Sequence, residues 1–360
     1  MGFPYYVARP VKKPEALNEL GRPRRLDQDS PQGYEPDPGL VNAVNVALII
    51  GQPLLLTGEA GTGKTQLAYN VAWQFGDEKL GNDKPIKFET KSTSKASDLF
   101  YTYDTLRRFR ATQDANMSQE NKAYITYNAL GKAILLTRPL KDVERWLDSD
   151  FGHTGPRRSV VLIDEIDKAP RDFPNDILNE IDNMYFKVPE LSNDKIEANS
   201  SLWPIVILTS NSEKNLPDAF LRRCVYYNIP FPDDKQMATI VKNRIREYEK
   251  QGGGDPAAAA KSADDSNTEL LDDALNFFYS LRAKENQLFK KPATAELLGW
   301  LTAMLMLGAD VDNKLAQMVK DASGRMSNIA ELTLSALVKN SDDQKLAYYY
   351  LEDYLQQNPA

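Results

Sequence analysis

The eight residues GEAGTGKT, from Gly58 to Thr65, restrict the possible folds of this chain more than any other stretch. They match the phosphate-loop pattern G-x-x-x-x-G-K-[ST] at each fixed position. Glycines at 58, 61 and 63 allow the backbone N–H groups to turn inward without Cβ clashes. Those amides, together with the positive end of a following helix, hold phosphate oxygens. The stretch therefore predicts a loop that binds the phosphates of a nucleotide.

The residues around this loop fit the same interpretation. The apolar strand pattern PLLLTG precedes it, and the helical pattern TQLAYNVAWQFG follows it. Lys64 is predicted to supply a point charge for the β and γ phosphates, and the Thr65 hydroxyl is a predicted Mg²⁺ ligand; the residues do not separate ATP from GTP. The alternative, a glycine-rich turn with only a structural role, does not require Lys-Thr at a helix start. The predicted nucleotide-binding residues are Gly58, Glu59, Ala60, Gly61, Thr62, Gly63, Lys64, Thr65 and Gln66.

Two adjacent acids follow a second apolar strand, in VVLIDEIDKAP. Asp164 stands at the carboxyl end of that strand and is predicted to hold Mg²⁺ through water. Glu165 is predicted to be the general base that polarises the attacking water, a group that P-loop kinases usually lack. The alternative is that the acids only begin a loop or cap a helix. Their position about one hundred residues after Lys64, at the end of an apolar strand, favours the interpretation as a metal and water site.

A third strand pattern, IVILTSN, ends in Thr209, Ser210 and Asn211. A polar side chain at this point can orient the water or contact the γ-phosphate. We choose Asn211 as the best candidate, and the alternative is that it is a turn residue.

The order of the patterns predicts three regions. Residues 1–35 form an arm rich in Pro, Arg and Lys. Residues 36–232 alternate short apolar strands with helices, which predicts an α/β domain with a mostly parallel sheet covered on both faces. Inserts are expected within it at about 92–128 and 182–200. Residues 233–360 contain helical patterns and a glycine- and alanine-rich loop, and predict a second, all-α domain.

Composition narrows the class of protein. The net charge is −7, which argues against broad, non-specific nucleic-acid binding as the main activity. The single cysteine, Cys224, excludes an internal disulfide and fits a reducing compartment. No apolar run approaches the roughly 20 residues of a membrane helix, and the first residues lack the apolar stretch of a secretory signal. We expect a cytoplasmic protein.

Taken together, GEAGTGKT, VVLIDEID, LTSN and LPDAFLRRC resemble the AAA+ ATPases in order and spacing. Within that superfamily the chain looks most like the MoxR branch. FETKSTSKASDLFYTYD lies where that branch has its helix-2 insert, and LNEIDNMYFKVPEL where its hairpin begins. The resemblance implies a P-loop NTPase three-layer αβα domain followed by an all-α lid domain. It also implies hexameric rings and chaperone-like remodelling of a client protein, often with a partner that bears a von Willebrand factor A domain.

Arginine candidates come from the same resemblance. Arg222 and Arg223 follow the third strand, where an arginine acts on the nucleotide of the neighbouring subunit. Arg223 is our choice for this finger, although the two roles could be swapped, and the alternative is that both make only surface salt bridges. The lid of the family usually offers an arginine just after a proline, but Ala293 stands there. Lys290, Lys291 and Thr294 are possible substitutes, of which we choose Lys291, and the alternative is that lid sensing is weakened.

The leading expectation is therefore Mg²⁺-dependent ATP hydrolysis by an oligomeric remodeller, with Lys64, Glu165, Asn211, Arg222 and Arg223 as the catalytic set. One alternative is a nucleic-acid-directed motor or loader, which the basic residues of the arm favour: Arg9, Lys12, Lys13, Arg22, Arg24 and Arg25. Another is a nucleotide-gated scaffold or signalling switch with slow hydrolysis. The aromatic residues of DLFYTYD either pack in the fold or line a ring pore.

Overall fold

The computed structural model describes residues 31–112, 120–211, 216–250, 269–283, 288–320 and 325–359. These belong to two compact units: an α/β unit within Asp29–Phe231 and a second unit within Pro232–Ala360. Most of the expected N-terminal arm, including its six basic residues, lies outside the described residues, as does most of the glycine- and alanine-rich loop.

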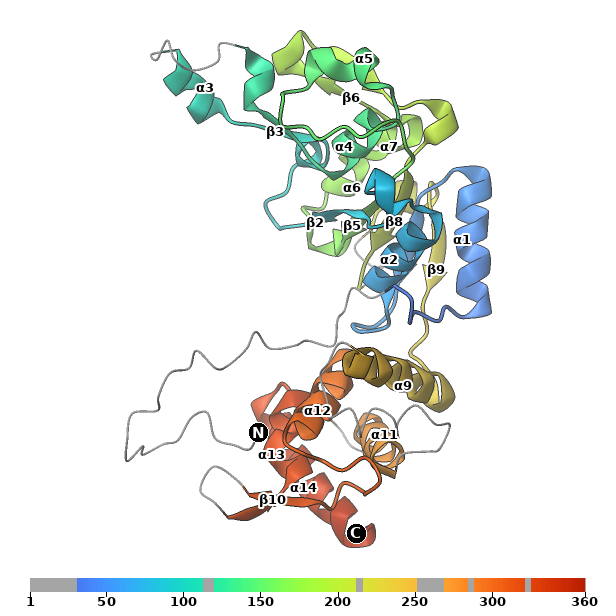
Figure 1. The fold of residues 1–360 in the computed structure, drawn as a ribbon, viewed down its shortest axis with the longest axis vertical. Helices are drawn as coiled ribbons and strands as arrows, with labels where there is room; N and C mark the ends of the chain where they lie inside the picture. Colours follow the sequence, from blue (N-terminus) through green and yellow to red (C-terminus); the bar gives the residue numbers. More distant parts are fainter. Residues whose placement is uncertain are drawn as a thin grey trace. The chain divides into compact units, whose positions relative to one another are not determined.

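The α/β unit is built on one five-stranded sheet, whose order is β2-β5-β8-β1-β9 and whose strand pairs are all parallel (Figure 1). The strands are β1 (Leu54–Thr57), β2 (Ile86–Glu89), β5 (Val160–Asp164), β8 (Ile205–Thr209) and β9 (Val225–Asn228). Since parallel strands end at the same edge of a sheet, the carboxyl ends of β1, β5 and β8 lie together. The structure confirms the predicted α/β fold class.

Helices cover both faces of this sheet, because successive strand residues point to opposite sides. Leu54, Leu56, Leu162 and Ile207 pack with α1 (Pro38–Ile50) and α2 (Lys64–Phe75). The intervening residues join a larger core on the other face, with α4 (Ala129–Leu135), α6 (Phe173–Asp176) and α7 (Leu178–Asn183). β1 and β5 are buried throughout, which explains why their sequences are continuous apolar runs. Two further short helices are α5 (Leu140–Val143) and α8 (Asp218–Leu221).

Two antiparallel hairpins extend this larger core. The first pairs β3 (Tyr101–Tyr103) with β4 (Ile125–Tyr127), and α3 (Thr105–Ala111) lies between them in the chain. The second pairs β6 (Tyr185–Val188) with β7 (Asp194–Glu197). Both fall within the segments expected to be inserts.

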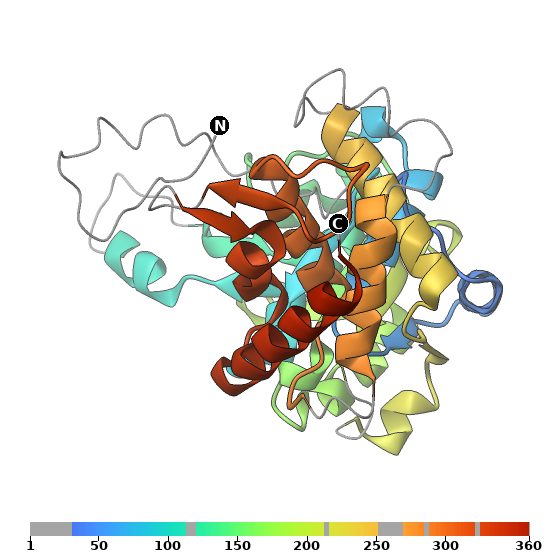
Figure 2. The same cartoon turned by 90° about the horizontal axis from the view of Figure 1, so that it is seen from below.

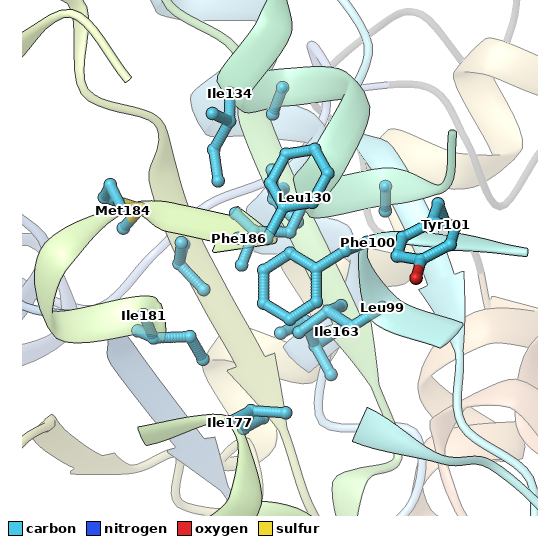
Figure 3. Packing of buried hydrophobic residues seen from close by; sticks show 14 of the residues in the cluster. Leu99, Phe100, Tyr101, Leu130, Ile134, Ile163, Ile177, Ile181, Met184 and Phe186 are labelled. Atoms are coloured by element: carbon cyan, nitrogen blue, oxygen red, sulfur yellow. The ribbon is translucent and has the colours of Figure 1, made fainter. Parts of the chain in front are cut away.

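The aromatic run of the first insert packs in the core. Phe100 and Tyr101 are buried, and the rings of Phe100 and Phe186 stack with centroids 5.4 Å apart (Figure 3). The Tyr101 hydroxyl donates a hydrogen bond of 2.9 Å to Glu190. The pore-lining interpretation is therefore wrong for Phe100 and Tyr101, because their rings join the two hairpins to each other.

The second unit is mainly helical (Figure 2). Its core includes Trp300 and Phe277. It also contains an antiparallel hairpin of β10 (Met318–Lys320) and β11 (Met326–Asn328), where only helices were expected. Strands of three residues are too short to show a period of two in the sequence. The helices are α9 (Asp234–Lys250), α11 (Glu269–Arg282), α12 (Thr294–Met306), α13 (Ile329–Leu337) and α14 (Ser341–Gln357). In the part of the chain that the structure describes, no helix is both long enough and apolar enough to span a bilayer.

Two helical glycines provide a test of this packing. A Cβ atom added at Gly131 in α4 meets the Phe100 carbonyl oxygen at 2.0 Å, whereas one added at Gly299 in α12 meets nothing within 4 Å. We expect Gly131→Ala to lower the free energy of unfolding by about 1–3 kcal/mol through overpacking. Gly299→Ala should raise it by about 0.5–1 kcal/mol, because alanine loses less backbone entropy in a helix.

Urea denaturation followed by circular dichroism measures both effects, and Gly299→Ala serves as the matched control for glycine replacement. A Gly131→Ala protein as stable as the wild type would show that the first insert does not pack tightly on α4.

Candidate nucleotide-binding site

The loop between β1 and α2 needs glycine at its two ends for reasons of space as well as backbone angle. Gly58 and Gly63 have φ of 141° and 87°, and Gly61 has 81°. A Cβ atom at Gly58 would lie 2.6 Å from the Ile229 carbonyl oxygen, and one at Gly63 would lie 2.9 Å from the Tyr34 ring. The loop is therefore held between Ile229, the residue after β9, and Tyr34, a residue for which the sequence predicted no role.

Lys64, the first residue of α2, is held inside the loop. Its side chain is buried, and Nζ donates hydrogen bonds of 2.8 Å to the carbonyl oxygens of Gly58 and Glu59. Burial lowers the pKa of Lys64, while the carboxylates of Asp167, Asp164, Glu165 and Glu59 oppose that shift. The ammonium group is thus already at the loop that is predicted to hold phosphates.

The Asp164 carboxylate connects three elements at the carboxyl edge of the sheet. Its Oδ1 accepts hydrogen bonds from Thr65 Oγ1 at 3.0 Å and from Thr209 Oγ1 at 2.6 Å. Burial opposes ionisation of this group, but the hydrogen bonds from Thr209, Lys87 and Thr65 and the charge of Lys87 together place the pKa of Asp164 below its ordinary value. The structure therefore brings the two predicted metal-binding residues, Thr65 and Asp164, into direct contact.

Strand alternation explains this convergence. Along β5, Val160 and Leu162 pack on the side of the sheet that α1 and α2 cover, so the Asp164 side chain lies on that side too. On β8, Ile205 and Ile207 pack on this same side, so the Thr209 side chain also lies there. The side chain that reaches Asp164 from the third strand is thus Thr209, which is 1% exposed, rather than the preferred Asn211.

Lys87 on β2 is a residue that sequence reasoning missed. Ile86 and Phe88 pack against the opposite core, so Lys87 lies on the α2 side of the sheet. Its Nζ is 3.0 Å from Asp164 Oδ2 and 2.9 Å from Glu89 Oε1. The only available signal was the alternation within PIKFET, combined with the pairing of β2 next to β5, which the sequence does not reveal.

Glu165 has an unusual backbone conformation for a residue other than glycine, with φ 56° and ψ 51°. Its N–H donates a hydrogen bond of 2.9 Å to Thr209 Oγ1. The carboxylate is partly exposed and forms an ion pair with Lys168. Left-handed backbone at such a residue costs on the order of 1–3 kcal/mol and is often found at functional sites.

The polar residues after β8 lie further out. Asn211 is exposed, and its N–H donates to Asp167 Oδ1 at 3.4 Å. Arg222 is exposed at the end of α8. Arg223 forms an ion pair with Asp182 of α7, with 2.7 Å between Nε and Oδ2. The pKa of the adjacent Cys224 is raised to about 12 by burial and by the charge of Asp182, so this thiol is poorly reactive.

The lid candidates belong to the second unit. Lys291 Nζ donates to the Arg282 carbonyl oxygen at 2.7 Å. Ala293 precedes α12, and its N–H donates to Glu296 Oε2 at 3.2 Å. The position at which the family offers an arginine is therefore a helix N-cap here. The role of Lys291 stays a prediction.

The donor set at Thr65 and Asp164 fits Mg²⁺, which prefers oxygen ligands. Within the described ranges, no cluster of three or more His, Cys, Asp or Glu side chains could hold a metal ion without further ligands. A magnesium ion here would therefore depend on phosphate oxygens and water for most of its coordination. This is the usual situation in P-loop sites, where one or two protein groups and the nucleotide share the ion.

Comparison with known proteins shows that the residues of this site match a family model. Residues 53–224 match the family model described as AAA domain (dynein-related subfamily). No curated protein matches the sequence closely enough to count as a relative. Among solved structures, domain III of the replication initiation protein DnaA from Thermotoga maritima is 13% identical, and the match covers 92% of this chain and 98% of that one. Its TM-score of 0.38 is too low to support an argument. The family match covers the phosphate loop, Asp164, Thr209 and Arg223, and it supports an AAA domain of the AAA+ ATPase superfamily at residues 53–224.

Proposed function

We propose that this protein is a Mg²⁺-dependent ATPase of the MoxR type, which acts as an oligomeric, chaperone-like remodeller of a partner protein. The observation that carries the catalytic part is the contact of Asp164 with Thr65 and Thr209, which joins the phosphate loop to the carboxyl ends of β5 and β8. The match to an AAA domain supports ATP binding and ATP-driven activity in general. The two hairpins at β3–β4 and β6–β7 support the MoxR branch.

Catalysis in such a site consists mainly of positioning and charge stabilisation. Lys64 contacts the β and γ phosphates and exchanges its bonds with loop carbonyls for bonds with phosphate oxygens. Mg²⁺, when bound, supplies positive charge to the same phosphate oxygens. Thr65 and Asp164 would hold that ion, and Asp164 would do so through water.

Glu165 accepts the proton of the attacking water. Its carboxylate forms an ion pair with Lys168 at the surface, and this pair has to open before the carboxylate can face the water. Thr209 accepts the hydrogen bond from the Glu165 N–H, and therefore ties the backbone of the base to the carboxylate of Asp164. Asn211 stays a candidate for contact with the water or the γ-phosphate.

Oligomerisation supplies the remaining positive charge. Arg223 acts in trans on the nucleotide of a neighbouring subunit, with Arg222 as a second contact, and the expected assembly is a hexameric ring. In this role Arg223 leaves Asp182, and the exposure of their ion pair means that this exchange costs little. The client is a protein, and a partner with a von Willebrand factor A domain remains our expectation.

Glu165→Gln should retain ATP binding and lose turnover by about 10²–10⁴-fold, because the amide cannot accept the proton. Phosphate release measures turnover, and a titration with fluorescent ATP measures binding. Glu144→Gln, at an exposed acid outside the site, is the control and should behave as the wild type. Normal hydrolysis by Glu165→Gln would remove Glu165 from the mechanism.

Lys64→Ala should weaken ATP binding by about tenfold or more, because a charge-assisted contact with the phosphates is lost. The same fluorescent titration measures this affinity. Lys79→Ala removes an exposed lysine in the same unit and should leave the affinity unchanged. Equal affinities for Lys64→Ala and the wild type would place the phosphates elsewhere.

Mixing Arg223→Ala subunits with Lys64→Ala subunits should restore part of the ATPase activity that each lacks alone. The reason is that an intact phosphate loop in one subunit then meets an intact arginine from its neighbour. Hydrolysis is measured as a function of the mixing ratio.

Asp182→Ala is the matched control for this mixing experiment, because it removes the ion pair but keeps the arginine. Its turnover should stay within about threefold of the wild type, as expected for an exposed pair. A loss equal to that of Arg223→Ala, with no recovery on mixing, would reduce Arg223 to an intramolecular structural role.

A further inference from the structure

The side chain of Lys87 contacts two carboxylates. It lies on β2 at the edge of the sheet, and its Nζ contacts Asp164 Oδ2 at 3.0 Å and Glu89 Oε1 at 2.9 Å. Its side chain is 30% exposed and that of Glu89 is 70% exposed, whereas that of Asp164 is only 12% exposed. Lys87 thus connects a carboxylate at the predicted metal site with one in solvent.

The two oxygens of Asp164 have different partners. Oδ1 accepts hydrogen bonds from Thr65 and Thr209, and Oδ2 contacts Lys87. The threonines orient one oxygen, and the ammonium group occupies the other. The 3.0 Å contact between Lys87 Nζ and Asp164 Oδ2 is therefore an ion pair.

We propose that Lys87 is a positioning residue, an internal counter-cation that competes with Mg²⁺ for Asp164 and so raises the concentration of Mg²⁺ that the site requires. This inference rests on the proposed Mg²⁺-dependent ATPase and adds a residue that sets the metal affinity of that same site.

Electrostatics supplies the direction of the effect. A second cation close to Asp164 repels a divalent ion and reduces the negative charge that attracts it. Magnesium is held in such sites through a few carboxylates and several waters, so the ion and its waters would compete with Lys87 for the Asp164 carboxylate. Glu89 gives Lys87 an alternative partner. The stronger the Lys87–Glu89 ion pair is, the more readily Lys87 releases Asp164.

The test measures metal binding directly, with Mn²⁺ as the probe. Electron paramagnetic resonance of Mn²⁺ in the presence of a non-hydrolysable ATP analogue gives the dissociation constant of the ion for each full-length variant. Lys87→Met keeps the aliphatic stem but removes the charge, so the dissociation constant should fall by about threefold or more. Lys87→Arg keeps the charge and should bind Mn²⁺ as the wild type does.

Glu89→Gln should act in the opposite direction. It leaves Lys87 with Asp164 as its one carboxylate partner, so Mn²⁺ should bind about threefold or more weakly. Its side chain is largely exposed, so this variant keeps the inference testable if Lys87→Met does not fold. The Mg²⁺ concentration that gives half-maximal ATP hydrolysis should shift in parallel in each variant.

An unchanged or higher dissociation constant in a folded Lys87→Met protein overturns the counter-cation role. A fall in Lys87→Arg as large as the fall in Lys87→Met also overturns it, because arginine keeps the positive charge. Hydrolysis in the wild type with no shift among the variants leaves the ATPase standing and removes the role of Lys87. If Mn²⁺ binding shifts among the variants but the wild type does not hydrolyse ATP, the role of Lys87 in metal binding stands and the proposed ATPase activity is wrong. Absence of Mn²⁺ binding by the wild type with the analogue overturns both.

Discussion

The hydrogen-bonded bridge at Asp164 is the constraint on which the rest of the site depends. One carboxylate oxygen accepts from a residue of the phosphate-loop helix and from a residue of the neighbouring strand. Because β8 lies between β5 and β1 in the sheet, this bridge also requires the strand order that the structure has. A change of parity by one residue in β5 or β8 would turn Asp164 or Thr209 toward the opposite core. The parallel register is therefore as important to the chemistry as the side chains themselves.

The local parts of the site could be predicted because single short stretches carry them. GEAGTGKT contains the loop, its lysine and its threonine within eight residues, and VVLIDE contains a buried strand and its terminal acids. Residues that meet only through the sheet could not be predicted. Lys87 looked like an ordinary strand lysine, since nothing in PIKFET shows that β2 pairs with β5. The polar end of IVILTSN offered three candidates, and only the packing of Ile205 and Ile207 identifies Thr209 as the one that faces Asp164.

The fold, too, could be predicted only where a single stretch of sequence carries a clear pattern. Long or strongly apolar elements, such as β1, β5 and α12, were found from their patterns. The short strands β10 and β11 were not, because three residues do not display a period. The aromatic residues of the first insert illustrate a different difficulty: an apolar run in an insert has the same composition whether it faces a partner or its own core. Their burial against Phe186 became visible only through contacts between segments that are some eighty residues apart.

The contact between the two hairpins has a mechanical consequence. Phe100 stacks on Phe186 (Figure 3). Tyr101 also donates a hydrogen bond to Glu190, so the two inserts share one packing surface. The chain enters the second hairpin from β5, after Asp164, and leaves it toward β8, before Thr209. The second hairpin is therefore connected in the chain to two strands, β5 and β8, whose ends meet at the Asp164 carboxylate. Because the second hairpin packs on the first, both inserts are connected to the strands that carry Asp164 and Thr209.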